Sequence, residues 1–323
     1  MSIRITIIGL GRLGASLGLA LGYHKDKITR IGLDRRAETA LQLEKQGGID
    51  KAAFNLQQAV DKTDLVILAL PPTEIEETLQ SIAPALRENA VVLDTSAAPL
   101  LAAELADKLL PPTRHFLGFY PTLNPLYVLD EPLNQKANAD LFKDGQVVIT
   151  CANNTPPEAL NLAADLAKLL GAAPYYCDPH EFQGWQARTA ALPRLLAAAL
   201  LHTAAGQPGW MDALKTSDAS FTAVAAAFDP SCAAEWRANR ENISRTLKAA
   251  IAALQEFDQV IADQDSTRLD SLLVQTQNDL ADWQKQRRSP VEARRDQERI
   301  SASGESISHA LGISQLGALF KNK

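Results

Sequence analysis

Three glycines near the amino end of the chain have the spacing of a phosphate-binding turn. They belong to a segment that consists of Gly9, Leu10, Gly11, Arg12, Leu13 and Gly14. Gly9 permits a tight turn, Gly11 lets the backbone approach a pyrophosphate, and Gly14 allows the following helix to pack closely. The free N–H groups and the dipole of that helix would hold the phosphates. The segment therefore predicts a dinucleotide-binding turn.

An acidic residue at the end of the next predicted strand indicates which dinucleotide binds. Asp34 lies twenty residues after Gly14, where a carboxylate can accept hydrogen bonds from the ribose of the adenosine. It would repel a 2′-phosphate, so NAD is the predicted cofactor. Arg35 and Arg36 keep NADP open, because a guanidinium group can pair with a phosphate or stack on adenine. We include Arg35 among the predicted cofactor contacts.

Another pair of cofactor candidates follows a strongly apolar run. Residues 64–70 read as a strand that is buried on both faces of a parallel sheet. Ligands of open α/β sheets bind at the carboxyl ends of the strands. Leu70 and Pro71 are therefore expected beside the cofactor.

The same rule selects three candidates for chemistry. The buried run 90–94 is followed by Ser96, and the short strand 115–118 leads into Tyr120 and Asn124. All three side chains can donate or accept a hydrogen bond. We predict them near the reacting part of a bound ligand.

These candidates need a framework, and strands alternate with helices over the first half of the chain. Predicted helices separate the strands at 37–46, 73–82 and 100–110. This alternation predicts an α/β fold with a doubly wound, Rossmann-type parallel sheet. A loop with a short helix is expected over 126–144, and a strand–helix–strand extension over 146–176. We assign residues 1–177 to a dinucleotide-binding domain.

Residues 178–323 are predicted to form an all-α domain that contacts substrate, mediates dimerisation and ends in a charged tail. A long helix is expected over 179–205, which Pro193 should kink or divide because proline lacks a backbone N–H. Further helices are expected over 229–261 and 265–286. Their many apolar positions predict a homodimer through this domain.

Composition excludes several classes of protein. The chain has 323 residues and a net charge of −6, which argues against a general nucleic-acid binder. No apolar run is long enough to span a membrane and no signal peptide is recognisable, so we expect a cytoplasmic protein. Three cysteines and five histidines show no metal-ligand spacing, and no metal site is predicted.

The chain also shares the pattern of one enzyme family. The segments that carry the similarity are 9–17, 32–35, 64–72, 92–96, 115–121, 187–193 and 229–240. They resemble the prephenate dehydrogenase family. The resemblance implies an oxidative decarboxylation, in which hydride passes from the hydroxyl-bearing ring carbon of prephenate to a nicotinamide and the ring carboxylate leaves as carbon dioxide. Such a site needs a hydrogen-bond acceptor for the hydroxyl and cations for two carboxylates.

The chain departs from the family at several polar positions. Tyr120 stands where the family has a histidine that contacts the ring hydroxyl, and a phenol that titrates near pH ~10 is a poor base. Ser96 is displaced by one position from the family's serine, and the lysine that follows is missing. Phe182 and Gln183 replace a His-Asp pair, and Arg194 replaces a histidine.

We therefore predict Tyr120, Ser96 and Asn124 as catalytic residues. Arg194 and Arg240 are predicted to bind a carboxylate of a small-molecule substrate. The alternatives are a packed aromatic side chain for Tyr120 and salt bridges within the protein for the arginines.

Three hypotheses on function follow. The first is an NAD(P)-dependent oxidoreductase of the prephenate dehydrogenase type, acting on prephenate or arogenate in tyrosine biosynthesis. The second is a dehydrogenase with the same fold and a less acidic substrate, because lost histidine and lysine residues make the pocket less cationic. The third is a non-catalytic, dimeric NAD-binding protein.

Overall fold

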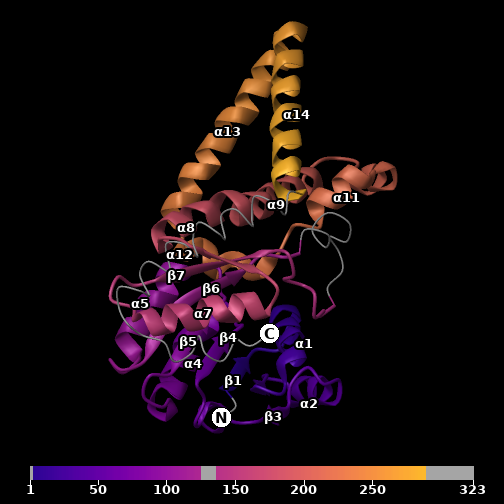
Figure 1. Cartoon of the computed structure of the whole chain (residues 1–323). Helices are drawn as coiled ribbons and strands as arrows, with labels where there is room; N and C mark the ends of the chain where they lie inside the picture. The colour runs from indigo at the N-terminus through magenta and orange to yellow at the C-terminus, as the bar shows by residue number, and fades with distance from the viewer. Residues whose placement is uncertain (1–2, 125–135, 289–323) are drawn as a thin grey trace. The chain divides into compact units, whose positions relative to one another are not determined.

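The computed structural model describes residues 3–124 and 136–288, and its contacts divide the chain into two units, 1–269 and 270–323. The first unit contains an eight-stranded sheet with the order β3-β2-β1-β4-β5-β6-β7-β8 (Figure 1). Neighbouring strands are parallel except β6 and β7. The first six strands have the doubly wound order of nucleotide-binding folds, which confirms the predicted fold class.

The strands lie close to their predicted positions. They are β1 (Ile3–Ile8), β2 (Ile28–Leu33), β3 (Lys51–Ala53), β4 (Leu65–Leu68), β5 (Val91–Asp94), β6 (His115–Pro121), β7 (Gln146–Cys151) and β8 (Ala173–Tyr176). The strand predicted over 64–70 is shorter than expected, whereas the one predicted over 115–118 continues to Pro121. The reason for the longer β6 is its antiparallel pairing with β7, in which Tyr120 lies opposite Val148.

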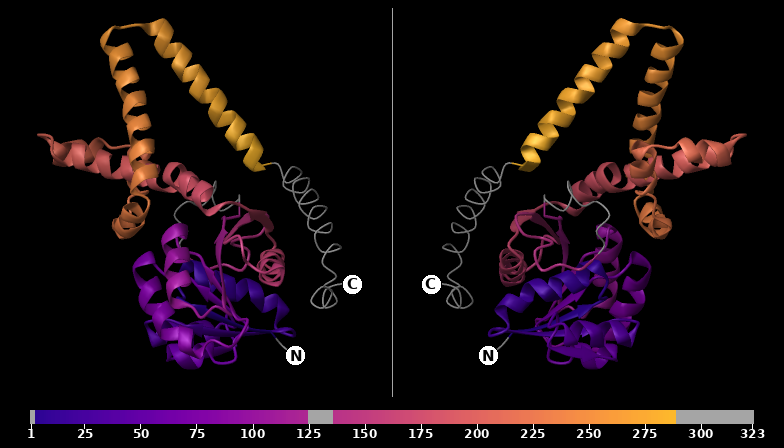
Figure 2. Two further views of the ribbon diagram at one scale, coloured as in Figure 1. Left: turned by 90° about the vertical axis from the view of Figure 1, so that its left-hand side faces the viewer. Right: turned by 90° about the vertical axis from the view of Figure 1, so that its right-hand side faces the viewer.

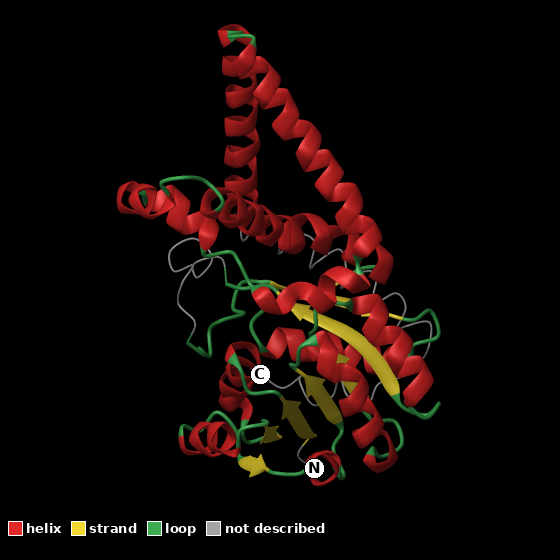
Figure 3. Ribbon diagram, turned by 180° about the vertical axis from the view of Figure 1, so that it is seen from behind, coloured by secondary structure: helices red, strands yellow, loops and turns green. Residues whose placement is uncertain are grey.

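Helices cover both faces of the sheet, as Figure 3 shows with helices in red and strands in yellow. They are α1 (Arg12–Leu21), α2 (Ala37–Lys45), α3 (Leu56–Val60), α4 (Pro72–Ile82), α5 (Pro99–Leu109) and α7 (Pro157–Leu169). Side chains of successive strand residues alternate between faces. Leu93 accordingly belongs to one hydrophobic core and its neighbour Val92 to another. The sheet thus lies between two apolar layers, as a parallel sheet requires.

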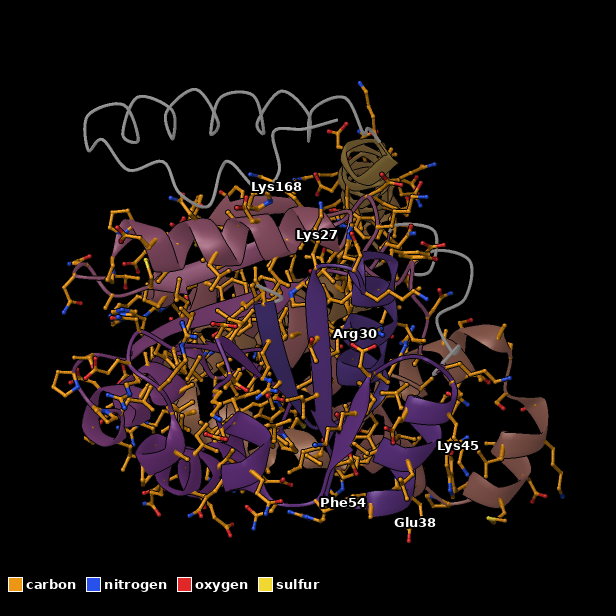
Figure 4. The ribbon with its side chains drawn as sticks, turned by 60° about the horizontal axis from the view of Figure 1, so that its bottom comes forward. Lys27, Arg30, Glu38, Lys45, Phe54 and Lys168 are labelled. Carbon is orange, nitrogen blue, oxygen red and sulfur yellow. The ribbon has the colours of Figure 1, made fainter. Side chains whose placement is uncertain are left out.

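A buried arginine ties α1 and α2 to the sheet. Arg30 of β2 is 2% exposed and lies among the strands in Figure 4, where it is labelled. It pairs with Asp50 at 2.6 Å and donates to the carbonyl groups of Gly18, Gly47 and Gly48. Burial alone would raise the pKa of Asp50, but hydrogen bonds and charge from Arg30 lower it below its ordinary value. This network holds the helix that follows the glycine turn.

A helical segment follows β8 within the same unit. It consists of α8 (Pro179–Gln186), a π-helical turn (Ala187–Ala191), α9 (Leu192–Ala205), α10 (Trp210–Ala213), α11 (Ala219–Ala225), α12 (Ala233–Ala238) and α13 (Arg240–Ala262). The helix predicted over 179–205 is helical throughout, and its irregularity is the π-helical turn Ala187–Ala191 just before Pro193. The wider turn accommodates a proline, which has no backbone N–H to donate to the preceding turn.

The change from sheet to helices falls where we predicted a domain boundary, between Tyr176 and Pro179. Both sides belong to the unit that extends to Leu269, so two separate domains stay a prediction. The short helix predicted within 126–144 lies largely outside the described residues, and residues 136–144 form turns.

Two long helices end the described part of the chain. α13 runs away from the sheet, as the two views of Figure 2 show in orange, and exposes Ile251, Leu254 and Ile261. α14 (Ser266–Arg288) supplies the described residues of the second unit. Within residues 3–124 and 136–288, no helix combines the length and apolar character needed to cross a membrane.

Candidate active site

The glycine turn joins β1 to α1 in a conformation that two of its glycines make possible. Gly9 has a φ of +91°, which side chains rarely adopt, and a Cβ there would collide with the carbonyl oxygen of Ala69. A Cβ on Gly14 would collide with the carbonyl oxygen of Gly9. The Gly9 N–H donates to Leu33 at 2.8 Å, so the turn is fixed against the end of β2.

Gly11 differs from the other two glycines. Its φ of −64° and ψ of −169° are open to any residue, and a Cβ there would meet no protein atom within 4 Å. Neither the backbone nor the packing of the protein therefore requires glycine at this position. α1 begins directly after it and has no side-chain cap, which leaves N–H groups at its start for a ligand. The turn fits a pyrophosphate that approaches its backbone closely.

Asp34 reaches back to this turn from the end of β2. Its Oδ2 accepts the N–H of Leu10 at 2.8 Å, and its Oδ1 accepts the N–H of Arg36 at 3.0 Å. Each carboxylate oxygen keeps a lone pair for a ribose hydroxyl. The Arg35 side chain, 78% exposed, forms an ion pair with Glu74 at 3.0 Å, which partly neutralises its charge. Both observations fit NAD better than NADP.

The other predicted cofactor residues surround the turn. Leu10 is buried, whereas Arg12 and Leu13 are half-buried. A Cβ on Gly9 would lie 2.9 Å from Cδ2 of Leu70, so Leu70 lies beside the turn, and its contact with the cofactor stays a prediction. Pro71 is exposed immediately before α4. The structure thus places these residues close to the carboxyl ends of the central strands β1 and β4.

Ser96 lies beside an acid for which the sequence pattern assigned no role. Its Oγ donates to Oδ2 of Asp94 at 2.7 Å, and its N–H donates to Oδ1 at 3.1 Å. Asp94 ends β5 and is 0% exposed. Burial raises the pKa of Asp94 to about 7, although the hydrogen bonds from Ser96 oppose this rise. This carboxyl group can therefore gain or lose a proton near neutral pH.

Tyr120 is packed in the sheet and faces away from solvent. The residue is 6% exposed, and its ring lies 4.6 Å from that of Phe182 on α8. Burial raises the pKa of Tyr120 well above its ordinary value, the charge of Asp94 raises it further, and the Thr150 hydroxyl opposes this rise. Tyr120 therefore remains a neutral phenol near neutral pH, and a catalytic role for it stays a prediction.

Asn124 is occupied by a contact within the protein. It is 6% exposed, and its side-chain amide donates to the carbonyl oxygen of Asp140 at 3.2 Å. Its backbone N–H donates to Leu141 at 2.7 Å. These bonds hold the end of β6 against the following segment, and a catalytic role for Asn124 stays a prediction.

The two predicted carboxylate-binding arginines lie on separate helices. Arg194 of α9 pairs with Glu235 of α12 at 2.8 Å, so part of its charge is already neutralised. Burial raises the pKa of Glu235, and the charge and hydrogen bond of Arg194 counteract that rise. Arg240 is exposed at the first position of α13. Substrate binding by either arginine stays a prediction.

A pair of amides links α8 to the start of α13. The Gln183 side chain donates to the backbone carbonyl oxygen of Ala238 at 3.1 Å. The Asn239 side chain donates to the backbone carbonyl oxygen of Gln183 at 2.8 Å. Both residues are nearly fully buried. This contact fixes Phe182, which packs on Tyr120, relative to Arg240.

Sequence reasoning overlooked Asp94 and Thr150 as members of the polar group at the ends of β5 and β6. An acid that ends an apolar strand two positions before a serine was the available signal for Asp94. Thr150 had no comparable signal, because it approaches the site only through the pairing of β7 with β6. Within the described residues, no group of three or more metal-binding side chains occurs.

The fold and the glycine turn together define a Rossmann-type nucleotide-binding protein. Residues 17–176 match the family model described as the nucleotide-binding domain of prephenate dehydrogenase. This part of the chain, just under half of its length, is similar to the nucleotide-binding domain of that family. The match begins after the glycine turn, so the turn and its geometry support NAD as the cofactor independently.

Individual relatives agree with this match. The chain is 25% identical over 199 residues to prephenate dehydrogenase of Bacillus subtilis, covering 61% of this chain and 53% of that protein. It is 28% identical over 176 residues to D-apionate oxidoisomerase of Cupriavidus necator, covering 53% and 60%. The matches thus span little more than half of these relatives.

A solved structure shows the same fold over most of the chain. It is prephenate dehydrogenase from A. aeolicus in complex with hydroxyphenyl propionate and NAD+. The TM-score is 0.76 at 19% identity, and the alignment covers 87% of this chain and 98% of that one.

Proposed function

We propose that this protein is an NAD-dependent dehydrogenase that oxidises a hydroxyl-bearing carbon of a small carboxylic acid. Prephenate and arogenate are the first substrates to consider, in agreement with the family. The observation that carries the proposal is the geometry of the glycine turn. Of its three glycines, Gly11 alone leaves free space at its Cβ position, and the Leu10 N–H of the turn donates a hydrogen bond to Asp34. This geometry fits the pyrophosphate and ribose of a dinucleotide.

We assign the following roles in cofactor and substrate binding to residues of the chain. The N–H groups at the start of α1 bind the pyrophosphate, and Asp34 accepts hydrogen bonds from the ribose. Bound NAD supplies the hydride acceptor. Ser96 lies just beyond the carboxyl end of β5, where it can orient a hydroxyl group. Arg194 and Arg240 are the candidates for a substrate carboxylate.

A second candidate is a dehydrogenase for a less acidic substrate. The pairing of Arg194 with Glu235 favours it, because a neutralised guanidinium attracts a second carboxylate less strongly. Tyr120 and Phe182 replace polar residues of the family with an aromatic contact. One relative is named for D-apionate, so relatives are not confined to prephenate as substrate.

The test is production of NADH by the purified full chain with prephenate and with arogenate, using NAD and NADP in turn. Turnover with either substrate supports the first candidate. Tight NAD binding without turnover on either favours the second candidate, which a screen of other hydroxy acids then examines. Absence of NAD binding would refute both candidates.

We also propose that the protein is a homodimer through its helical segment. The described part of this segment exposes apolar side chains, namely Leu196, Val224, Phe228, Ile251 and Leu254. Apolar positions of this kind are typical of helices that pack on a partner. Light scattering at micromolar concentration should give twice the chain mass, and a monomer would refute this proposal.

A further inference from the structure

Three adjacent strands place one polar side chain on each side of a glycine. Asp94 of β5 pairs in register with Gly118 of β6, and Gly118 lies opposite Thr150 of β7. Residues that pair in this way project from the same face of a sheet. Two strand spacings put the backbones of Asp94 and Thr150 about 10 Å apart. Gly118 has no side chain to fill the space between them.

The Tyr120 side chain fills this space instead. Tyr120 lies two positions after Gly118 and therefore on the same face. A Cβ on Gly118 would lie 2.5 Å from the Tyr120 hydroxyl oxygen, so the ring leans back over the glycine. The hydroxyl group is buried and forms no hydrogen bond of good geometry among the described residues, and the Thr150 hydroxyl is the polar group beside it. A buried hydroxyl that is only partly satisfied is costly and can still donate to a further acceptor.

Asp94 is the acidic neighbour of this hydroxyl. Its carboxyl group is fully buried, and Ser96 is its hydrogen-bond donor. No charged side chain among the described residues of the surrounding strands and helices shifts the pKa of Asp94. The charge of Asp94 in turn raises the pKa of Tyr120. The cluster thus contains one carboxyl group and three hydroxyl groups, those of Ser96, Tyr120 and Thr150, without a cation.

We propose that Asp94 takes up, through the hydroxyl of Ser96, the proton that the substrate hydroxyl loses during oxidation. This inference rests on the proposed function. The substrate O–H bond breaks as a new O–H bond forms on Ser96 Oγ, and the original Ser96 proton moves to Oδ2 of Asp94. The electron pair leaves the substrate as hydride to an oxidised nicotinamide, so the products are a carbonyl group, reduced nicotinamide and neutral Asp94.

Asp94 is a positioning residue in this scheme, because it acts through Ser96 and does not touch the substrate. The Tyr120 hydroxyl, which lies beside the Thr150 hydroxyl, is also a donor available to the ionised carboxylate, and such a bond would lower the cost of the charge on Asp94. The acid–hydroxyl pair supplies the proton acceptor that the family's histidine would supply. It also explains how Tyr120 can occupy the histidine's position while remaining a neutral phenol.

The first experiment titrates Asp94 in the full chain without substrate. We expect one aspartate ¹³C-carboxyl NMR signal that titrates near pH 7 and is absent in Asp94→Asn. Tyr120→Phe should raise its midpoint, because it removes the donor to the carboxylate. Thr95→Val is the matched control, since the Thr95 hydroxyl donates to Leu68, and it should leave the midpoint unchanged. An Asp94 signal that titrates near its ordinary value would overturn the proposal.

The raised pKa of Asp94 also predicts how the free energy of unfolding depends on pH. The native protein holds the Asp94 proton up to about pH 7, whereas the unfolded chain releases it near 3.8. The stabilisation is complete below 3.8 and is lost as the pH rises through about 7. The unfolding equilibrium constant of the native sequence, relative to that of Asp94→Asn, should rise roughly a thousandfold over this range. Parallel pH profiles for the two proteins would also overturn the proposal.

The second experiment measures kcat, KM and the NAD dissociation constant against pH. Asp94→Asn should lower kcat by roughly 10²-fold or more and abolish the pH dependence near 7, with NAD affinity unchanged. An unaltered kcat profile would refute proton uptake by Asp94 and leave the dehydrogenase function intact. Absence of turnover on every hydroxy acid tested would instead refute the proposed function and this step with it.

Discussion

Replacing Gly11 by valine should separate cofactor binding from folding. The new side chain meets no protein atom within 4 Å of its Cβ, and the backbone conformation suits any residue. Valine is a poorer residue than glycine before a helix, so the free energy of unfolding should fall by about 1 kcal/mol. The same side chain would project toward the pyrophosphate. Loss of two charge-assisted hydrogen bonds, at roughly 1.5–3 kcal/mol each, should raise the NAD dissociation constant roughly 10²–10⁴-fold.

Two measurements on the same protein decide this prediction. Fluorescence titration gives the NAD dissociation constant, and urea denaturation gives the free energy of unfolding. Gly14→Ala is the matched comparison, because its Cβ would collide with the Gly9 carbonyl and should destabilise the protein severely. Unchanged NAD affinity in folded Gly11→Val would refute the phosphate-turn assignment. Unfolding of Gly11→Val would show that the turn has a packing requirement absent from this structure.

Three further substitutions test other parts of the chain. Asp34→Ala should reduce the ratio of NAD to NADP affinity, because the carboxylate that repels a 2′-phosphate is removed; an unchanged ratio would contradict its ribose role. Asp50→Ala should lower the free energy of unfolding by about 3 kcal/mol in urea denaturation, because it leaves Arg30 buried without its anion. Gly184→Ala should raise that free energy by about 0.5–1 kcal/mol, because its Cβ enters open space within α8; a decrease would indicate an unrecognised contact.

Much of the nucleotide-binding half could be predicted from local patterns. The glycine spacing predicted the turn because two of its glycines meet requirements of the adjoining backbone, namely the positive φ of Gly9 and the close packing at Gly14. The apolar runs predicted the central strands because a strand covered on both faces has no polar side. Pro193 predicted an irregularity in the long helix, seen as the π-helical turn Ala187–Ala191, because a proline has no N–H to donate.

The candidate catalytic residues were harder to interpret, since their state depends on partners far along the chain. Arg194 is partly neutralised by a residue 41 positions later, and Asn124 bonds to one 16 positions later. Neither contact follows from periodicity or spacing. The sequence pattern located these residues near strand ends and helix starts, but could not determine which groups they already bind.

The sequence by itself determined the sheet, the glycine turn and the acid at the end of β2, because these depend on residues close together in the chain. The tertiary structure alone decided the environment of Asp94. Its raised pKa requires burial by several strands and helices, and its neighbour Tyr120 leans over Gly118, which lies opposite Thr150 in the β6–β7 pair. Burial and electrostatic environment are properties of the packed chain, and no local pattern encodes them.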